Sequence, residues 1–186
     1  MPKTRASGAA GTTVASYIKG LAAFLGNNYL ATSSNQVNNT VYYSPVQVPH
    51  NCTVHGIIIV HGATARTGNI YVALYDKNPA SWEPLNRVAV SASVACSGIT
   101  QKQLVPFTVD TPIVAGLYFC AVIKSVTNDN LLDAVIGSAS PIAPVGFAGT
   151  CYWTEAMGAY VTPPAVATPI QTITVTQTVW MWLYTV

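Results

Sequence analysis

Residues 170–185 read IQTITVTQTVWMWLYT, and this stretch decides the fold class. One parity is apolar and the other is polar, as in a strand with one face in a core and the other in solvent. The apolar parity holds Ile173, Val175, Val179, Met181 and Leu183, and the polar parity holds Thr172, Thr174, Thr176 and Thr178. The pattern predicts one continuous β-strand over 170–185.

The aromatic end of this stretch breaks the alternation. Trp180, Trp182 and Tyr184 continue the threonine parity, so both faces of the strand become apolar near its end. Tryptophan and tyrosine are enriched at interfaces because each joins a large apolar ring to a polar group. Either a loop of the same chain or a partner subunit would cover these side chains. We take the three residues as candidate partner-binding residues.

From residue 41 onward, β-branched and aromatic runs are separated by Pro, Gly, Asn and Asp at short intervals. Besides 170–185, these runs predict strands at 41–48, 53–62, 68–76, 86–95, 101–109, 116–125, 132–138 and 148–154. So many short strands in one domain predict an all-β fold. We expect an antiparallel two-sheet β-sandwich, jelly-roll-like, over residues 41–186.

The first 40 residues are predicted to form an extended N-terminal arm with a short helix and a polar linker. Thr12 or Thr13 can cap an amphipathic helix that stops at Gly26. Its apolar stripe, with three- and four-residue spacing, consists of Val14, Tyr17, Ile18, Leu21, Phe24 and Leu25. The stripe either docks on the same chain or grips a neighbouring subunit, so these six residues join the candidate partner-binding set.

Charged side chains are scarce. Hydrophobic types make up 51% of the 186 residues and charged types only 8%, against roughly a quarter in ordinary soluble domains. No window supplies the about 20 apolar residues that a spanning helix needs, and the start does not resemble a secretory signal. We therefore expect protein partners, including other copies of this chain, and no membrane partner.

The basic residues do not predict nucleic-acid binding. Residues 1–75 contain four basic residues and no acid, but Lys3, Arg5, Lys19 and Arg66 are too dispersed to form a cluster.

The sequence does not predict an enzyme or a cofactor. The acids Asp76, Glu83, Asp110, Asp129, Asp133 and Glu155 are scattered over separate turns. The sequence has no GxSxG, HExxH, phosphate-loop or GxGxxG motif. His55 and His61, predicted on one strand face with Ile57 and Ile59, would lie about 20 Å apart. Each histidine is expected to have a backbone or water partner instead of a metal.

The four cysteines show no CxxC pair, so no zinc or redox motif is predicted. Two disulfides remain possible. The preferred interpretation is cysteine as a small core residue, most clearly for Cys120 within LYFCAVI.

One series of segments has a familiar order. GNIYVALYD at 68–76 is followed by NPASWEPL at 78–85, QKQLVPFTVDTPIVAG at 101–116 and LYFCAVI at 117–123. Over residues 41–125 this order resembles the β-sandwich domains of head-decoration, head-fibre and tail-appendage proteins of tailed bacteriophages. In that pattern Tyr75 and Asp76 end one strand, Phe107 precedes a turn carrying Pro112, and Gly116 opens the strand that holds Tyr118.

The resemblance implies a virion protein, assembled in the host cytoplasm, with no catalytic residues to transfer. We expect a capsid decoration or cement protein that forms a homotrimer or other homo-oligomer and binds a major capsid or other virion protein. The alternative is a receptor- or glycan-binding tail or fibre appendage. Its stacking candidates are the loop aromatics Trp82, Trp153 and Tyr160.

Overall fold

The computed structural model describes residues 37–61, 68–96, 102–126, 153–170 and 181–185. For residue 171 and for the short strands at 16–19, 31–34, 131–135 and 177–179 it describes the backbone alone. Within these ranges the chain is all-β and every strand pair is antiparallel. The fold-class prediction is confirmed at that level.

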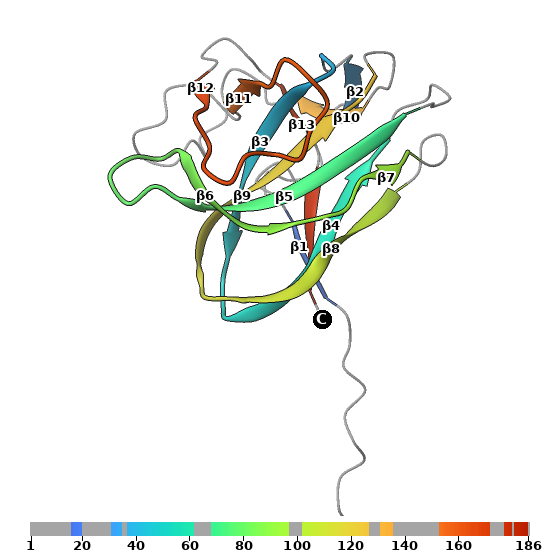
Figure 1. Ribbon diagram of the computed structural model, residues 1–186. Helices are drawn as coiled ribbons and strands as arrows, with labels where there is room; N and C mark the ends of the chain where they lie inside the picture. The colour runs from blue at the N-terminus through green and yellow to red at the C-terminus, as the bar shows by residue number, and fades with distance from the viewer. Residues whose placement is uncertain are drawn as a thin grey trace, which may run out of the picture.

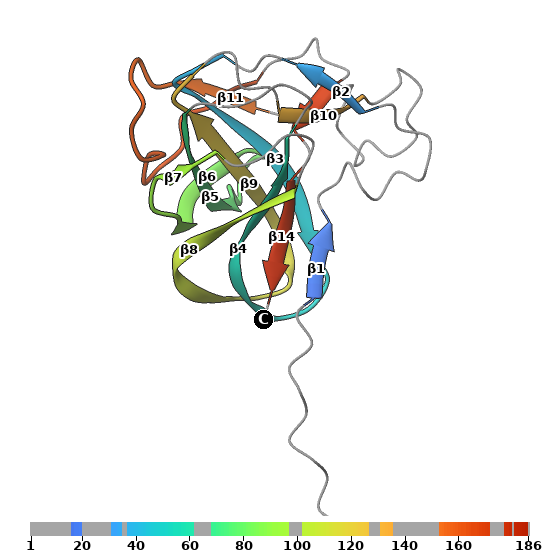
Figure 2. The same ribbon diagram turned by 90° about the vertical axis from the view of Figure 1, so that its right-hand side faces the viewer.

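The strands with a described backbone form three sheets (Figures 1 and 2). The four-stranded sheet has the order β1 (Ser16–Lys19), β14 (Met181–Thr185), β4 (Cys52–Val60) and β8 (Lys102–Ile113). The seven-stranded sheet has the order β12 (Ile170–Gln171), β11 (Trp153–Ala156), β3 (Thr40–Val48), β9 (Gly116–Lys124), β5 (Asn69–Lys77) and β6 (Pro84–Val90), with β7 (Val94–Ala95) also on β5. The three-stranded sheet has the order β13 (Gln177–Val179), β10 (Leu131–Val135) and β2 (Ala31–Ser34).

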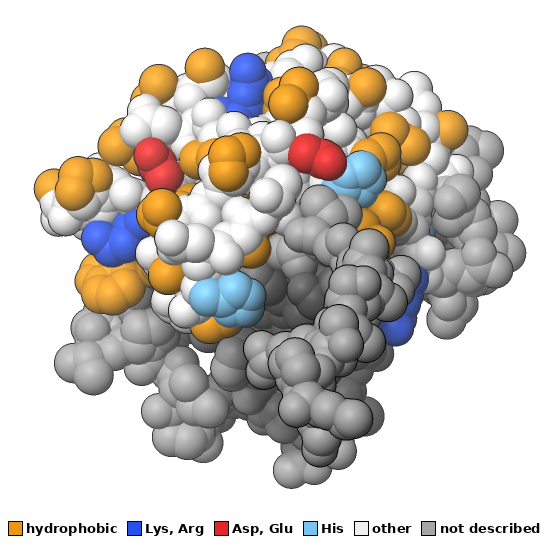
Figure 3. All heavy atoms as spheres, turned by 90° about the horizontal axis from the view of Figure 1, so that it is seen from below, with side chains coloured by type: hydrophobic (Ala, Val, Ile, Leu, Met, Phe, Trp, Pro, Cys, Tyr) orange, Lys and Arg blue, Asp and Glu red, His pale blue; other side chains and the backbone are white. Residues whose placement is uncertain are grey.

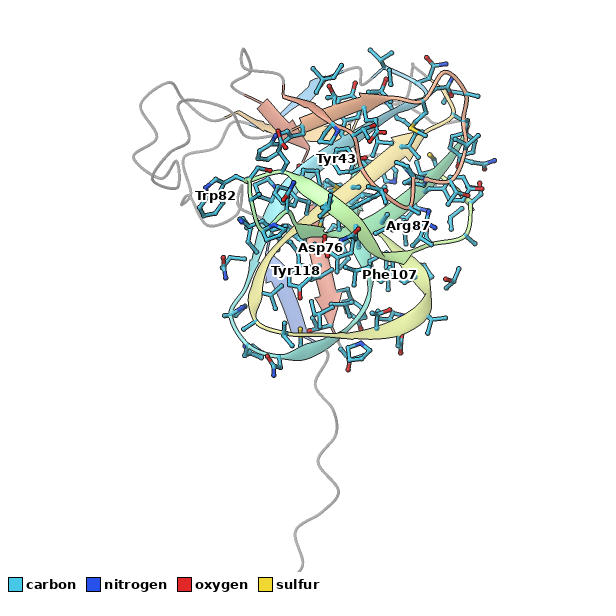
Figure 4. The ribbon with its side chains drawn as sticks, turned by 60° about the vertical axis from the view of Figure 1, so that its left-hand side comes forward. Tyr43, Asp76, Trp82, Arg87, Phe107 and Tyr118 are labelled. Carbon is cyan, nitrogen blue, oxygen red and sulfur yellow. The ribbon has the colours of Figure 1, made fainter. Side chains whose placement is uncertain are left out.

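The main core lies between the four-stranded and seven-stranded sheets. Even-numbered residues of the central strands β5 and β9 face this core, because successive strand side chains point to opposite faces. From the opposing sheet, Ile57 and Ile59 of β4 and Leu183 of β14 complete the contact. Phe107 and Tyr118 also belong to this cluster, and Figure 4 shows both within the body of the fold.

Odd-numbered residues of β3, β5, β9 and β11 form a second core on the other face of the seven-stranded sheet. Tyr43, Tyr75, Phe119 and Trp153 are buried there, and the rings of Phe119 and Trp153 meet edge to face at 5.0 Å. Because both faces of β5 and β9 are buried, the central residues of these strands, 70–75 and 117–123, are hydrophobic without alternation.

The segment after β11 covers this second core. Tyr75 donates its hydroxyl hydrogen to the Pro164 carbonyl at 2.6 Å, and Arg87 donates through Nη1 to the Pro163 carbonyl. Main-chain bonds also join the segment to β6, from Arg87 N to Ala165 O at 2.9 Å and from Ala167 N to Leu85 O at 2.7 Å. Residues 157–168 are thus fixed across the outer face of the sheet by tyrosine, arginine and main-chain contacts.

Two sequence predictions about elements are wrong. The described part of the predicted N-terminal helix, Ser16–Lys19, is strand β1, because its backbone pairs with β14. The predicted strand 170–185 is not continuous: its described parts are β12, β13 and β14, which belong to three different sheets. Residues 172–176 and 180 lie outside the described residues.

The other strand predictions agree with the structure to within a few residues, with two larger differences. The predicted strand 86–95 is divided into β6 and β7, and the strand predicted at 148–154 is described only as Trp153–Ala156. Strand β8 runs on through Pro112 to Ile113, so Phe107 lies inside a strand and not before a turn. Pro106 and Pro112 are tolerated because β8 is the last strand of its sheet.

Candidate interaction surface

Strand β14 presents two different faces, as its sequence predicts. Met181, Leu183 and Thr185 are buried, whereas Trp182 and Tyr184 point the other way and are half-buried. Val179 lies in β13, and its side chain, like that of Trp180, is outside the described part of the chain. The predicted parity is therefore confirmed over Met181–Thr185.

Trp182 belongs to an apolar row that crosses three strands. Its register partner on β4 is Ile58, and the partner of Ile58 on β8 is Leu104. Directly opposed residues of an antiparallel pair project to the same side. In this row Ile58 is buried, whereas 38% of Leu104 remains exposed. The row therefore forms an apolar strip on the outer face of the four-stranded sheet.

A second row lies beside the first. Tyr184 is opposite Gly56, which in turn is opposite Pro106, and Pro106 is exposed. We call Trp182, Tyr184, Ile58, Leu104 and Pro106 the outer patch.

Among the described side chains, the cation of Lys102 lies beside the outer patch. Lys102 Nζ lies 4.4 Å from the centre of the Trp182 ring. Such a cation–π contact contributes about 0.5–1 kcal/mol at an exposed site.

The edge of the patch is formed by His55, at an irregularity in β4. The register with β8 and with β14 shifts between Val54 and Gly56, so His55 is an extra residue in the strand. His55 Nδ1 lies 2.6 Å from Asp110 Oδ1, and its ring meets Tyr184 edge to face at 5.7 Å. The bulge reverses the parity, so the prediction that His55 shares a face with Ile57 and Ile59 is wrong.

His61 is placed differently. It is fully buried directly after β4, with Nε2 2.6 Å from Gln103 Oε1. Gln103 donates through Nε2 to the Ala95 carbonyl at 2.8 Å. Both histidines thus contact a side chain, where a backbone or water partner was predicted.

The structure brings together the two ends of the predicted partner-binding set. Tyr17 is the register partner of Tyr184, Ile18 of Leu183, and Lys19 of Trp182. The sequence predicted the N-terminal stripe and the C-terminal aromatics as two separate candidate surfaces. Val14, Leu21, Phe24 and Leu25 lie outside the described residues.

The described carboxylates all take part in local hydrogen bonds. Asp76 accepts from Asn86 N at 2.7 Å, Glu83 accepts from Ser81 at 3.0 Å, and Asp110 pairs with His55. Glu155 accepts from the Tyr43 hydroxyl at 2.6 Å. In the described ranges, no group of three or more His, Cys, Asp or Glu side chains is arranged to hold a metal ion.

The three predicted stacking aromatics differ in exposure. Trp153 is buried in the second core, and Tyr160 is half-buried against Tyr71 with its hydroxyl 2.9 Å from Ser93 Oγ. Trp82 is 45% exposed, with Lys77 Nζ 5.0 Å from the centre of its ring. Figure 4 shows Trp82 at the periphery of the fold.

Cys120 lies in the main core, as predicted, and its burial raises the pKa of its thiol to about 12. Cys52 and Cys96 are only partly buried. Cys52, Cys96 and Cys120 are free thiols. Cys52 lines a shallow open pocket with Asn51, Pro112 and Val114.

Among the residues with a described backbone, no helix is long and apolar enough to cross a membrane. No protein-family model, curated protein or solved structure matches the chain.

Proposed function

We propose that this chain is a non-enzymatic structural protein of a virus particle, a capsid decoration or cement protein. It binds other copies of itself, as a homotrimer or other homo-oligomer, and a major capsid or other virion protein. Its place is the virion, after assembly in the host cytoplasm. The virion assignment rests on the resemblance over residues 41–125 to bacteriophage β-sandwich proteins.

The observation that carries the self-association is the outer patch. Trp182, Ile58 and Leu104 form an apolar row across three strands, and Tyr184 and Pro106 extend it. Tryptophan and tyrosine at the centre of such a surface are the residue types that most often dominate binding energy. The patch therefore has the chemistry of an interface core.

The low charge of the surface favours the same conclusion. Figure 3 shows the face seen from below, where hydrophobic side chains lie among uncharged polar ones and only a few charged groups are visible. A protein that stays a free monomer normally keeps many interspersed charges on its surface. A subunit of a shell can do without them, since its neighbours cover part of that surface.

The fold is compatible with a shell subunit. The core shared by the four-stranded and seven-stranded sheets fits a two-sheet β-sandwich with jelly-roll-like character. The mechanism of such a protein is mechanical, because no bond is made or broken. Apolar area buried between subunits contributes about 25 cal/mol per Å², and symmetry repeats each contact over the shell.

A direct test is sedimentation velocity of the purified full-length chain over a wide concentration range. The proposal expects a defined oligomer that dissociates on dilution. A chain that remains a monomer at every concentration would contradict self-association.

The alternative is a receptor- or glycan-binding appendage, and Trp82 is the observation that favours it. A short hairpin loop presents this ring: Asn78 N bonds Glu83 O at 2.8 Å and Ala80 N bonds Asn78 Oδ1 at 2.9 Å. A glycan panel probed with wild-type protein and with Trp82→Ala separates the two functions. Binding that is lost in the variant supports the appendage, and no binding by the wild type supports the decoration protein.

A further inference from the structure

Strand β1 occupies the edge of the four-stranded sheet. All four of its residues, Ser16–Lys19, pair antiparallel with β14, and β14 pairs with β4 on its other side. Without β1, strand β14 would be the edge strand and would expose a row of unpaired backbone N–H and C=O groups. The β14 edge therefore needs a strand to cover it, and the chain itself supplies residues 16–19.

The pairing does not depend on which copy supplies the strand. Antiparallel pairing is formed by main-chain groups, and residues 16–19 of a second copy carry the same groups in the same register. Only the path of the connecting segment would differ. Because every contact of the pair is retained, exchange of an identical element is a low-cost route to an oligomer.

The position of β1 in the chain is suited to exchange. Eleven residues, 20–30, separate β1 from β2, and a segment of this length spans at most about 40 Å when extended. Strands β1 and β2 lie toward opposite ends of the molecule and in different sheets (Figures 1 and 2). The connection therefore does not hold β1 next to β2, and its length allows β1 to reach an adjacent subunit.

We propose that the β14 edge is a strand-acceptor site that binds residues 16–19 of a second copy, so that neighbouring subunits exchange β1. This inference rests on the proposed self-association and specifies strand exchange as the way in which the copies join. The exchanged strand ends next to the outer patch, because Lys19 and Tyr17 are the register partners of Trp182 and Tyr184. The same region of the sheet would then receive both the strand and the apolar contact.

The test uses disulfides between register partners. Ser16 is the partner of Thr185, so Ser16→Cys and Thr185→Cys are placed on two differently tagged full-length chains and co-expressed. Exchange predicts an interchain bond between these two positions, identified by mass spectrometry of the linked peptides so that bonds to native cysteines are recognised. The matched control is Ser16→Cys with Ala92→Cys, because Ala92 is exposed and is not a register partner of β1. Random collision would link this pair as well.

The double variant Ser16→Cys/Thr185→Cys on one chain tests the competing arrangement, in which β1 pairs with β14 of its own chain. If the chain is oligomeric and only an intrachain bond forms, exchange is wrong and self-association stands. If the chain sediments as a monomer, both proposals are wrong. A failure to link the two positions in either experiment, or linkage no greater than in the control, also overturns the exchange.

Discussion

At the scale of single residues, the β-bulge at His55 sets the shape of the outer patch. The extra residue turns His55 toward Asp110 and Tyr184, while Val54 and Ile57 on either side both remain in the core. The next residue, Gly56, lies where the backbone of β8 comes close to β4. A Cβ at this position would lie 2.5 Å from Val105 O and 2.9 Å from Pro106 Cα.

Gly56→Ala is therefore expected to destabilise the protein by about 1–3 kcal/mol, the usual cost of forcing a methyl group into a packed site. The obstacle is backbone, so a side-chain rotation cannot relieve it. The control is Gly116→Ala, whose Cβ would meet only the Tyr118 ring at 3.6 Å. Urea denaturation measures both, and equal stability of the two variants would contradict the close approach.

Tyr43 gives a prediction about alkaline pH. Its pKa is raised above the ordinary value of 10.0, first by burial and then by its neighbours Tyr75 and Glu155. The unfolded chain thus loses this proton at a lower pH than the folded chain. The stabilisation that the folded protein gains from its tighter hold on the Tyr43 proton is fully present below about pH 10. It is lost as the pH rises toward the folded-state pKa of Tyr43.

We expect the Tm of the wild type to fall more steeply than that of Tyr43→Phe between about pH 9 and pH 11. Calorimetry at several pH values measures the difference. The raised pKa of Cys120 contributes equally to both proteins and cancels in the comparison. Parallel curves would show that Tyr43 does not hold its proton more tightly in the folded state.

At the scale of elements, the covering segment 157–168 depends on Glu155. This carboxylate accepts from Tyr43 at 2.6 Å, from Thr168 N at 3.1 Å and from Thr168 Oγ1 at 2.8 Å. It therefore joins β3, β11 and the end of the segment.

Glu155→Gln is expected to cost about 1–3 kcal/mol, since an amide offers fewer acceptor positions and leaves a partly buried donor unsatisfied. Glu83→Gln is the matched control, because Glu83 is bonded to Ser81 within one hairpin loop and its loss should stay below about 1 kcal/mol. Thermal unfolding compares the two. Equal losses would mean that Glu155 does not hold the segment.

The sequence predicted most elements, and the misses have physical causes. Alternation located the buried face of β14, because Met181 and Leu183 do face the core. The same alternation could not show that the chain changes sheet between Gln171 and Met181, since register depends on partners distant in sequence. The Val14–Leu25 spacing favoured a helix, but β1 is set by pairing with β14, a tertiary contact that overrides local propensity.

The candidate site could be predicted only in part. Trp182 and Tyr184 were recognisable because they break the threonine alternation. Ile58, Leu104 and Pro106 could not be assigned to the same surface, because their alignment comes from the register of three strands. The bulge that turns His55 outward could not be recognised from the alternation of apolar and polar residues.

At the scale of the whole molecule, the described part of the chain has two apolar cores and one outer patch. The cores bury both faces of the seven-stranded sheet. The four-stranded sheet contributes one face to the main core and carries the patch on the other, where Ile58 is buried, Trp182 and Tyr184 are half-buried, and Leu104 and Pro106 are exposed. A sheet with an apolar outer face is unusual for a protein that remains alone in solution. We therefore propose that the subunit contacts lie on this sheet.

Trp182→Ala tests that claim most directly, with oligomer mass and Tm measured on the same sample and Trp82→Ala as the matched control. An interface at the patch predicts that association weakens by about 2 kcal/mol or more, while the Tm of the subunit stays near that of the wild type and the control still assembles. The contradicting result is an oligomer that persists together with a loss of roughly 3–5 kcal/mol in folding stability. That outcome would mean that the chain itself covers Trp182.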